Sequence, residues 1–142
     1  MNSILLQVGV KVLLKNADGK ILILKRSEEK YGKMSGSWDI VGGRIDPGTG
    51  LIENLKREVK EETQLEISSE PKLIAAQDIL LPERHVVRLT YIAHANGEPV
   101  LDLSENGEYR WVTFDELTTM DDLDVFIKKL ITSGELHSDS WN

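Results

Sequence analysis

The chain has 142 residues, the usual size of one domain. Hydrophobic residues make up 40% of it, which is enough for a buried core. The chain has no cysteine, so this core forms without disulfides. Its formal net charge of −7 argues against duplex nucleic acid or an anionic membrane as a partner. A small phosphate ligand stays compatible with this charge, because a bound divalent cation can reverse the local field. Without a membrane-spanning apolar run or a signal-like start, we expect one cytoplasmic domain over residues 1–142.

A β-hairpin is predicted near the N-terminus. Residues Val8–Lys15 and Lys20–Lys25 are rich in Val, Ile and Leu and flank the turn-forming run Asn16–Gly19. Because both runs are almost continuously apolar, we expect both of their faces to be covered. A polar loop over Ser27–Ser37 and a short strand over Trp38–Val41 follow.

The rest of the chain mixes helices and strands. A turn at Asp46–Gly48 precedes a helical pattern over Gly50–Thr63. Later in the chain we expect three strands, at Lys72–Leu80, Val86–Ala95 and Tyr109–Thr113, and then two helices, at Phe114–Leu117 and Asp121–Ile131. The last ten residues or so are expected to fray. This order predicts an α+β fold in which helices cover both faces of a mixed sheet.

The helix predicted over Gly50–Thr63 carries carboxylates on its apolar side. At about 100° per residue, its buried stripe consists of Leu51, Ile52, Leu55 and Val59. Glu62 falls inside this stripe, Glu58 on its edge and Glu61 just beyond Glu58. Like charges at these spacings repel, and burial adds a desolvation cost. A divalent cation held by carboxylate oxygens would offset both, whereas the ordinary alternative is a solvated acidic face.

The run Gly43–Leu65 resembles the sequence box of the Nudix hydrolase family. That box reads Gly, five residues, Glu, seven residues, Arg-Glu, an apolar residue, any residue, Glu-Glu, any residue, Gly and an apolar residue. The matching positions are Gly43, Arg57, Glu58, Val59, Glu61, Glu62 and Leu65. Thr49 stands where the first Glu is expected, and Gln64 where the Gly is expected. The segment Leu81–His85 looks like the MutT-like branch of the family, and Glu108–Val112 looks like its late strand.

The resemblance implies the Nudix fold, an α/β/α sandwich around a mixed β-sheet. It also implies a Mg²⁺-dependent hydrolase, with Mn²⁺ as a substitute, that cleaves a phosphoanhydride bond. The implied substrate is a nucleoside diphosphate linked to another moiety, with a (d)NTP or a modified nucleotide as the first choice. Glu58, Glu61 and Glu62 would be the metal ligands. A homodimer is common in the family and compatible with this sequence.

The resemblance implies further catalytic residues. Arg57 would orient the carboxylates, and Glu58 is the first choice for a ligand close to the attacking water. Glu61 would act with them. Glu108 is a candidate for a second base or extra ligand, because family members often use an acidic residue from this region. Glu105 competes with Glu108 for that role, and the sequence does not choose between them.

Five residues are candidates for binding the substrate. Gly42 and Gly43 permit close approach of the backbone to a ligand, although a tight turn would explain them equally. Arg84 could hold the base or a phosphate, or simply be a solvated surface residue. Trp38 and Tyr31 could stack on a base, and Trp38 could instead belong to the core.

The two departures from the box leave an alternative open. Thr49 cannot carry a charge, so we expect Glu53, one turn before Arg57, to hold that arginine instead. Gln64 is expected to take a positive φ at some cost in strain. A catalytically weakened, nucleotide-binding sensor would explain Thr49, whereas the retained carboxylates favour an enzyme. Leu81, where an aromatic residue could have stacked on a purine, weakens the case for oxidised guanine nucleotides.

Overall fold

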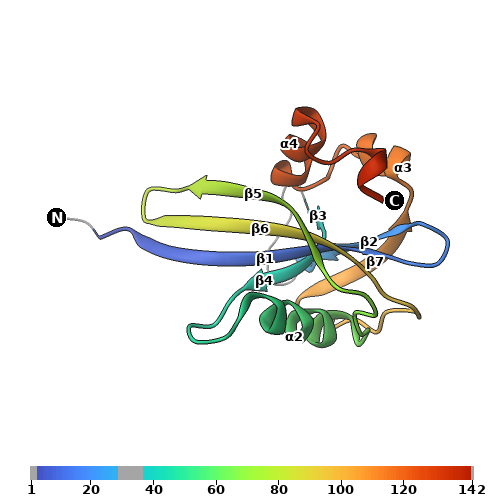
Figure 1. The fold of residues 1–142 in the computed structure, drawn as a ribbon, viewed down its shortest axis with the longest axis horizontal. Helices are drawn as coiled ribbons and strands as arrows, with labels where there is room; N and C mark the ends of the chain where they lie inside the picture. Colours follow the sequence, from blue (N-terminus) through green and yellow to red (C-terminus); the bar gives the residue numbers. More distant parts are fainter. Residues whose placement is uncertain (1–2, 29–36, 142) are drawn as a thin grey trace.

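A computed structural model describes residues 3–28 and 37–141, which form a seven-stranded mixed sheet with helices on both faces (Figure 1). The strands are β1 (Leu5–Lys15), β2 (Ile21–Arg26), β3 (Trp38–Asp39), β4 (Val41–Arg44), β5 (Lys72–Leu80), β6 (Arg84–His94) and β7 (Asn106–Val112). The helices are α2 (Leu51–Thr63), α3 (Phe114–Thr118), α4 (Val125–Ser133) and the short 3₁₀ helix η1 (Ser138–Trp141). The predicted α+β class and layering are confirmed.

Strand β1 organises the sheet. It pairs in parallel with β6 along its whole length, from Leu5 opposite Arg84 to Lys15 opposite His94. Its other edge is antiparallel to β4 over residues 9–12 and then to β2 at Lys15 alone. Strands β2 and β4 therefore diverge from the same edge of β1, and the sheet opens between them.

Two apolar layers cover the faces of this sheet. On one face, Val10, Val12 and Leu14 of β1 belong to a buried cluster with Leu55 and Val59 of α2. The other face packs against α3 and α4 through the buried cluster that includes Leu13, Ile21, Ile23, Leu117, Ile127 and Leu130. Successive side chains of a strand point to opposite faces, so the continuous apolar runs of the hairpin follow from burial on both sides, as predicted.

Helix α2 differs in one respect from the predicted stripe. Leu51 is 37% exposed, whereas Asn54 is fully buried. The Asn54 side chain accepts a hydrogen bond from the Asp46 amide at 3.2 Å and donates to the Arg44 carbonyl at 3.4 Å. These hydrogen bonds to β4 and the loop after it hold the polar Asn54 side chain in the interior. The prediction that Leu51 is buried was wrong, because helical periodicity alone does not account for such polar contacts.

The C-terminal region is more ordered than the sequence suggested. Helix α4 starts at Val125 and not at Asp121, because the Asp124 carboxylate caps it by accepting from the amides of Phe126 and Ile127. The expected fraying of the last ten residues is wrong for Leu136, which is 1% exposed and donates its amide hydrogen to the Leu130 carbonyl. Among the described residues, none of the helices is long and apolar enough to cross a membrane.

Candidate active site

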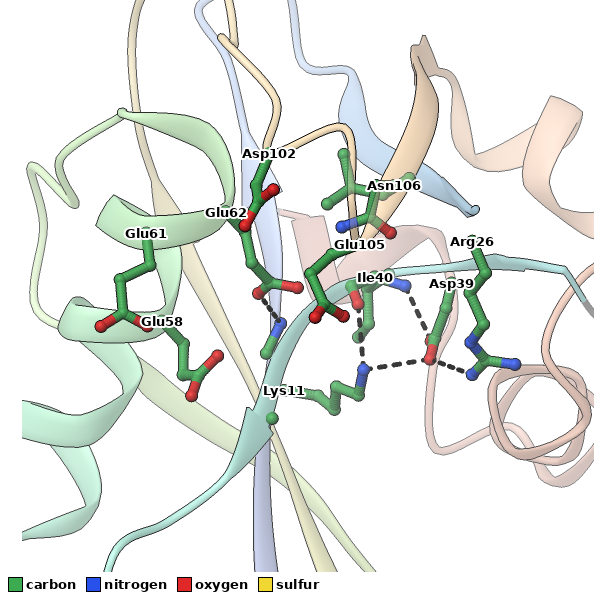
Figure 2. Close-up of a pocket in the computed structure, with 13 residues that line it drawn as sticks. Lys11, Arg26, Asp39, Ile40, Glu58, Glu61, Glu62, Asp102, Glu105 and Asn106 are labelled. Atoms are coloured by element: carbon green, nitrogen blue, oxygen red, sulfur yellow. Dashed lines mark hydrogen bonds and ion pairs between the residues drawn. The ribbon is translucent and has the colours of Figure 1, made fainter. Parts of the chain in front are cut away.

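A cavity of about 410 Å³ lies where β2 and β4 diverge, beside α2 (Figure 2). Its carboxylates come from three parts of the chain: Glu58, Glu61 and Glu62 from α2, Asp102 and Glu105 from the loop before β7, and Asp39 from β3. Lys11, Arg26, Asn106, Gly42 and Gly43 also line it. The predicted ligand set Glu58, Glu61 and Glu62 is thus brought to one cavity, together with acidic residues far away in the sequence.

Glu62 is anchored at the inner wall of the cavity. Its Oε2 accepts a hydrogen bond of 3.0 Å from the Gly42 amide. Burial raises the pKa of Glu62 to about 7; the neighbouring charge of Glu58 adds to the rise, while Lys11 and hydrogen bonds from Gly42 and Asn106 oppose it. Because burial disfavours the charged form of Glu62, a cation that enters the cavity would stabilise that charged form.

Glu58 lies directly over Gly43. A Cβ atom at residue 43 would come 2.9 Å from Glu58 Oε2 and 3.0 Å from its Cδ, so a residue other than glycine would displace this carboxylate from its present position. Burial raises the pKa of Glu58 and the charge of Glu61 adds to the rise, while Arg57 opposes it. The preceding glycine, Gly42, has a different role. Gly42 has φ +145°, and a Cβ there would lie 2.1 Å from the Val10 carbonyl oxygen.

Arg57 connects the carboxylates of α2 to the loop before the helix. Its Nη1 donates to both carboxylate oxygens of Glu61 at 3.1 Å, and the hydrogen bond to Glu61 raises the pKa of Arg57. Its Nη2 lies 3.1 Å from Asp46 Oδ2 and 3.4 Å from Glu58 Oε1. Among the described residues no ion pair joins Arg57 to Glu53, so the expected Glu53 pair is wrong. The Arg57 guanidinium faces Glu58 and Glu61, and its exposed negative partner is Asp46.

A buried ionic network continues from this cavity into the sheet. Asp39 Oδ2 lies 3.0 Å from Lys11 Nζ and 2.8 Å from Arg26 Nη2, and its Oδ1 lies 3.3 Å from Arg88 Nη2. Arg88 Nη1 also lies 3.1 Å from Asp124 Oδ2. Burial alone would raise the pKa of Asp39, but Lys11, Arg88 and Arg26 outweigh it and hold that pKa well below its usual value. Asp39 is therefore a carboxylate at neutral pH.

The same ionic network also lines a second cavity, of about 310 Å³. It has an apolar side formed by Ile79, Leu81, Val86 and Phe126. Its polar side is formed by Lys11, Arg26, Arg44, Arg88, Asp39 and Asp124. Because Lys11, Arg26, Asp39 and Gly43 line both cavities, the two hollows adjoin each other.

Several predicted site residues lie elsewhere. Glu108 is exposed on β7, with Lys25 at 4.0 Å, and it is Glu105 that lines the acidic cavity. Arg84 begins β6 and lines neither cavity, while Trp38 is 8% exposed within the core beneath α3 and α4. Glu108, Arg84 and Trp38 therefore line neither of the two cavities, since tertiary packing and not local sequence sets which way a side chain faces. Tyr31 lies outside the described residues.

Two charged residues within apolar strands are sequence signals of this network. Lys11 interrupts an otherwise apolar strand, and Asp39 interrupts the apolar run Trp38–Val41. A charged residue inside a buried strand must find a partner, so each such interruption marks a buried ion pair or a site. Asp102 and Asn106 carry no comparable signal, because Asp102 lies within the loop before β7 and Asn106 directly follows that loop.

Within residues 3–28 and 37–141, no group of three or more His, Cys, Asp or Glu side chains converges closely enough to hold a metal ion as they stand. Carboxylates that repel one another remain apart until a cation lies between them. The donors are nevertheless of one kind, hard oxygen ligands on neighbouring turns of one helix.

Residues 5–133 match the model of the NUDIX domain, which covers most of the chain. This chain belongs to the Nudix family. The family box runs from Gly43 on β4 through α2 to Leu65, so its carboxylates are those that enter the acidic cavity. The Nudix assignment therefore agrees with the sequence resemblance and with the geometry of the site.

Known relatives lie in the MutT-like branch of the Nudix family. The chain is 28% identical over 106 residues to a protein of Bacillus subtilis described as a putative 8-oxo-dGTP diphosphatase; the match covers 74% of this chain and 65% of the relative. It is 27% identical over 124 residues to the nucleoside triphosphatase NudI of Escherichia coli, covering 80% of this chain and 86% of NudI. The crystal structure of a MutT protein from Methanosarcina mazei superposes with a TM-score of 0.80 at 25% identity, covering 94% and 95% of the two chains. The protein is thus a MutT-like Nudix hydrolase, an enzyme class that acts on phosphoanhydrides.

Proposed function

We propose that this Nudix hydrolase cleaves a phosphoanhydride bond of a nucleoside triphosphate, normal or modified, in a Mg²⁺-dependent reaction. The observation that carries the proposal is the pairing of two adjoining hollows. The acidic cavity contains five carboxylates from α2 and the loop before β7, and the second cavity has an apolar side beside a polar network. The carboxylates of the acidic cavity suit metal-bound phosphates, and the apolar and polar sides of the second cavity suit the flat, partly polar nucleoside.

The donor set of the acidic cavity fits Mg²⁺, with Mn²⁺ as a substitute. Glu58, Glu61 and Glu62 offer carboxylate oxygens, the ligands that a hard cation prefers. Burial raises the pKa values of Glu58 and Glu62, so a cation would relieve both desolvation and mutual repulsion. The hydrogen bonds from Arg57 to both carboxylate oxygens of Glu61 limit where that side chain can turn.

Each residue of the cavity has a separate task in the proposed reaction. Bound Mg²⁺ would supply charge neutralisation for the phosphate oxygens and the leaving phosphate. Glu105 accepts a proton from the attacking water as its oxygen bonds to phosphorus and the bond to the leaving phosphate oxygen breaks. Arg57 holds Glu61 in place through hydrogen bonds to both of its carboxylate oxygens. The Gly42 amide holds Glu62 in place.

The names of the relatives support a nucleoside triphosphate as the first substrate to test. One relative is described as a putative 8-oxo-dGTP diphosphatase and another as a nucleoside triphosphatase. Leu81 lines the second cavity where an aromatic ring would favour a purine, so pyrimidine nucleotides belong in the same panel.

The test is an assay of phosphate and pyrophosphate release. The purified protein is incubated with the normal (d)NTPs, 8-oxo-dGTP, ADP-ribose and dinucleoside polyphosphates, with Mg²⁺ or with EDTA. We expect Mg²⁺-dependent turnover of at least one triphosphate that falls by about 100-fold or more in Glu61→Gln and Glu62→Gln, since these changes remove proposed ligands. Glu105→Gln tests the proposed base, with Glu108→Gln as its matched control on β7.

Glu53→Gln on the exposed face of α2 controls for changes to the helix itself, and we expect it to keep full activity. Turnover that survives in Glu61→Gln and Glu62→Gln would contradict the proposal. Tight nucleotide binding without turnover of any compound would instead identify a sensor, for which Thr49 is the first residue to revert to Glu.

A further inference from the structure

We propose that Lys11 is a substrate-binding residue that contacts the phosphate nearest the nucleoside, and that Asp39 positions it for this contact. The inference rests on the proposed function, because it assumes that phosphates occupy the acidic cavity and the nucleoside occupies the second one. It concerns a residue of β1, outside the Nudix box.

Lys11 occupies the boundary between the two cavities. It lines both of them, and its side chain is only 18% exposed. A ligand with its phosphates in one hollow and its nucleoside in the other must cross this boundary. The phosphate attached to the nucleoside would therefore be the group that meets Lys11.

The backbone opens a path for this side chain. Lys11 is opposite Gly42 in the pairing of β1 with β4. A Cβ at residue 42 would lie 2.8 Å from Lys11 Cα and 2.9 Å from Lys11 Cδ, so any other residue at 42 would collide with the lysine stem. Gly42 thus serves both carboxylate and lysine: its amide holds Glu62, and its missing side chain lets Lys11 reach the cavity.

The ammonium group of Lys11 is held by two hydrogen bonds and, in the part of the chain that the structure describes, has one donor left for a ligand. Its Nζ donates to Asp39 Oδ2 at 3.0 Å and to the Ile40 carbonyl at 3.2 Å, as Figure 2 shows. An ammonium has three donors, and within the described residues the third has no protein partner. A phosphate oxygen is an acceptor suited to such a charged donor.

Asp39 holds the lysine in position and does not cancel its charge. Three cations, Lys11, Arg26 and Arg88, pair with Asp39, and both arginines pair with Asp124 as well. Asp39 Oδ1 also accepts a hydrogen bond of 2.8 Å from the Ile40 amide. Because Asp39 is held by several donors at once, the Lys11 ammonium stays in one place before the substrate arrives. Such preorganisation reduces the entropy lost on binding.

The competing explanation is that Lys11 only compensates the buried charge of Asp39. Under that explanation, loss of Lys11 would destabilise the fold but would weaken the binding of a nucleoside and of its monophosphate equally. The proposal predicts a loss that depends on the phosphate. The comparison of the two ligands therefore separates a contact with substrate from a structural role.

The experiment measures, by calorimetry in the presence of Mg²⁺, the binding of adenosine, guanosine, cytidine and uridine and of their 5′-monophosphates. The proteins are the wild type, Lys11→Met, Lys11→Arg, Asp39→Asn and the control Lys15→Met, which changes a lysine of the same strand that lines neither cavity. For the base that binds best, we expect Lys11→Met to weaken the monophosphate by about tenfold or more, as loss of a charged hydrogen bond predicts, while leaving the nucleoside unchanged. Lys11→Arg should restore part of the loss, and Asp39→Asn should reproduce part of it.

Equal losses for nucleoside and monophosphate in Lys11→Met, or no loss for either, would overturn the proposal, and so would undetectable binding of every monophosphate to the wild type. The proposed hydrolase function fails separately, through the phosphate-release assay. A monophosphate-specific loss without turnover would keep Lys11 as a phosphate-binding residue in a sensor. If Lys11→Met does not fold, as judged by its thermal melting, Lys11→Arg decides the matter through its monophosphate affinity relative to the nucleoside.

Discussion

Asp46 Oδ2 lies 3.1 Å from Arg57 Nη2, and this ion pair connects the loop before α2 to the arginine that holds Glu61. The box position that usually carries a Glu is Thr49 in this chain. The Thr49 amide donates to the Asp46 carbonyl at 3.1 Å, so the two residues belong to one turn. Asp46 therefore supplies, from three residues earlier, a negative charge that Thr49 cannot provide.

Replacing Asp46 should impair the site more than the fold. Both partners of the pair are partly exposed, so we expect Asp46→Asn to change the free energy of unfolding by less than about 1 kcal/mol. Arg57 would then be freer to move with Glu61, and we expect kcat to fall roughly three- to tenfold, as loss of about 1 kcal/mol of positioning predicts. Steady-state kinetics and urea unfolding measure the two effects. Glu53→Gln is the control, and an equal fall in kcat in that variant would contradict the role of Asp46.

The stability of the metal-free protein should depend on Glu62. Its pKa is raised in the folded state from 4.5 to about 7, so its contribution to stability is complete below about pH 4.5 and is lost as the pH rises through 7. We expect Glu62→Gln to be more stable than the wild type at pH 8 in EDTA, by at most about 3 kcal/mol, with the difference shrinking toward pH 5. Chemical unfolding at a series of pH values measures it. A difference that does not change between pH 5 and pH 8 would contradict the shifted pKa.

Substitution of Gly43 should act through Glu58. The Cβ of Gly43→Ala would lie 2.9–3.2 Å from the Glu58 carboxylate group, which can swing aside because it is the end of a flexible side chain. We expect a large fall in Mg²⁺-dependent turnover with only a small change in melting temperature. Gly50→Ala is the control, because a Cβ there meets no atom within 4 Å. Wild-type turnover in Gly43→Ala would rule out the need for close approach of Glu58.

Restoring glycine at the end of α2 should stabilise the protein without affecting its chemistry. Gln64 has φ 62° and donates its amide hydrogen to the Lys60 carbonyl, the geometry of a left-handed helix cap. We expect Gln64→Gly to raise the free energy of unfolding by roughly 0.5–1 kcal/mol, since glycine adopts this conformation without steric cost. The urea midpoint at unchanged slope is the measurement, with activity as the control. A lower midpoint would mean that the Gln64 side chain makes a compensating contribution.

The sequence by itself determined the elements and the local chemistry. Box spacing and helical periodicity together predicted that Glu58, Glu61 and Glu62 lie on one flank of a helix, and the structure directs all three into one cavity. The positive φ of Gln64 is likewise a local property that a single helix end imposes. Such predictions succeed because they depend on residues a few positions apart, whose geometry is fixed by the backbone itself.

Only the tertiary structure decided which distant residues complete the site. Asp39 pairs with Lys11 from 28 residues away, and the choice of Glu105 over Glu108 depends on how the loop before β7 approaches α2. Arg57 selects Asp46 and not Glu53 because its guanidinium faces the loop that Asn54 anchors. These contacts arise where β2 and β4 diverge from β1, and the pairing of strands far apart in sequence leaves no trace in local periodicity.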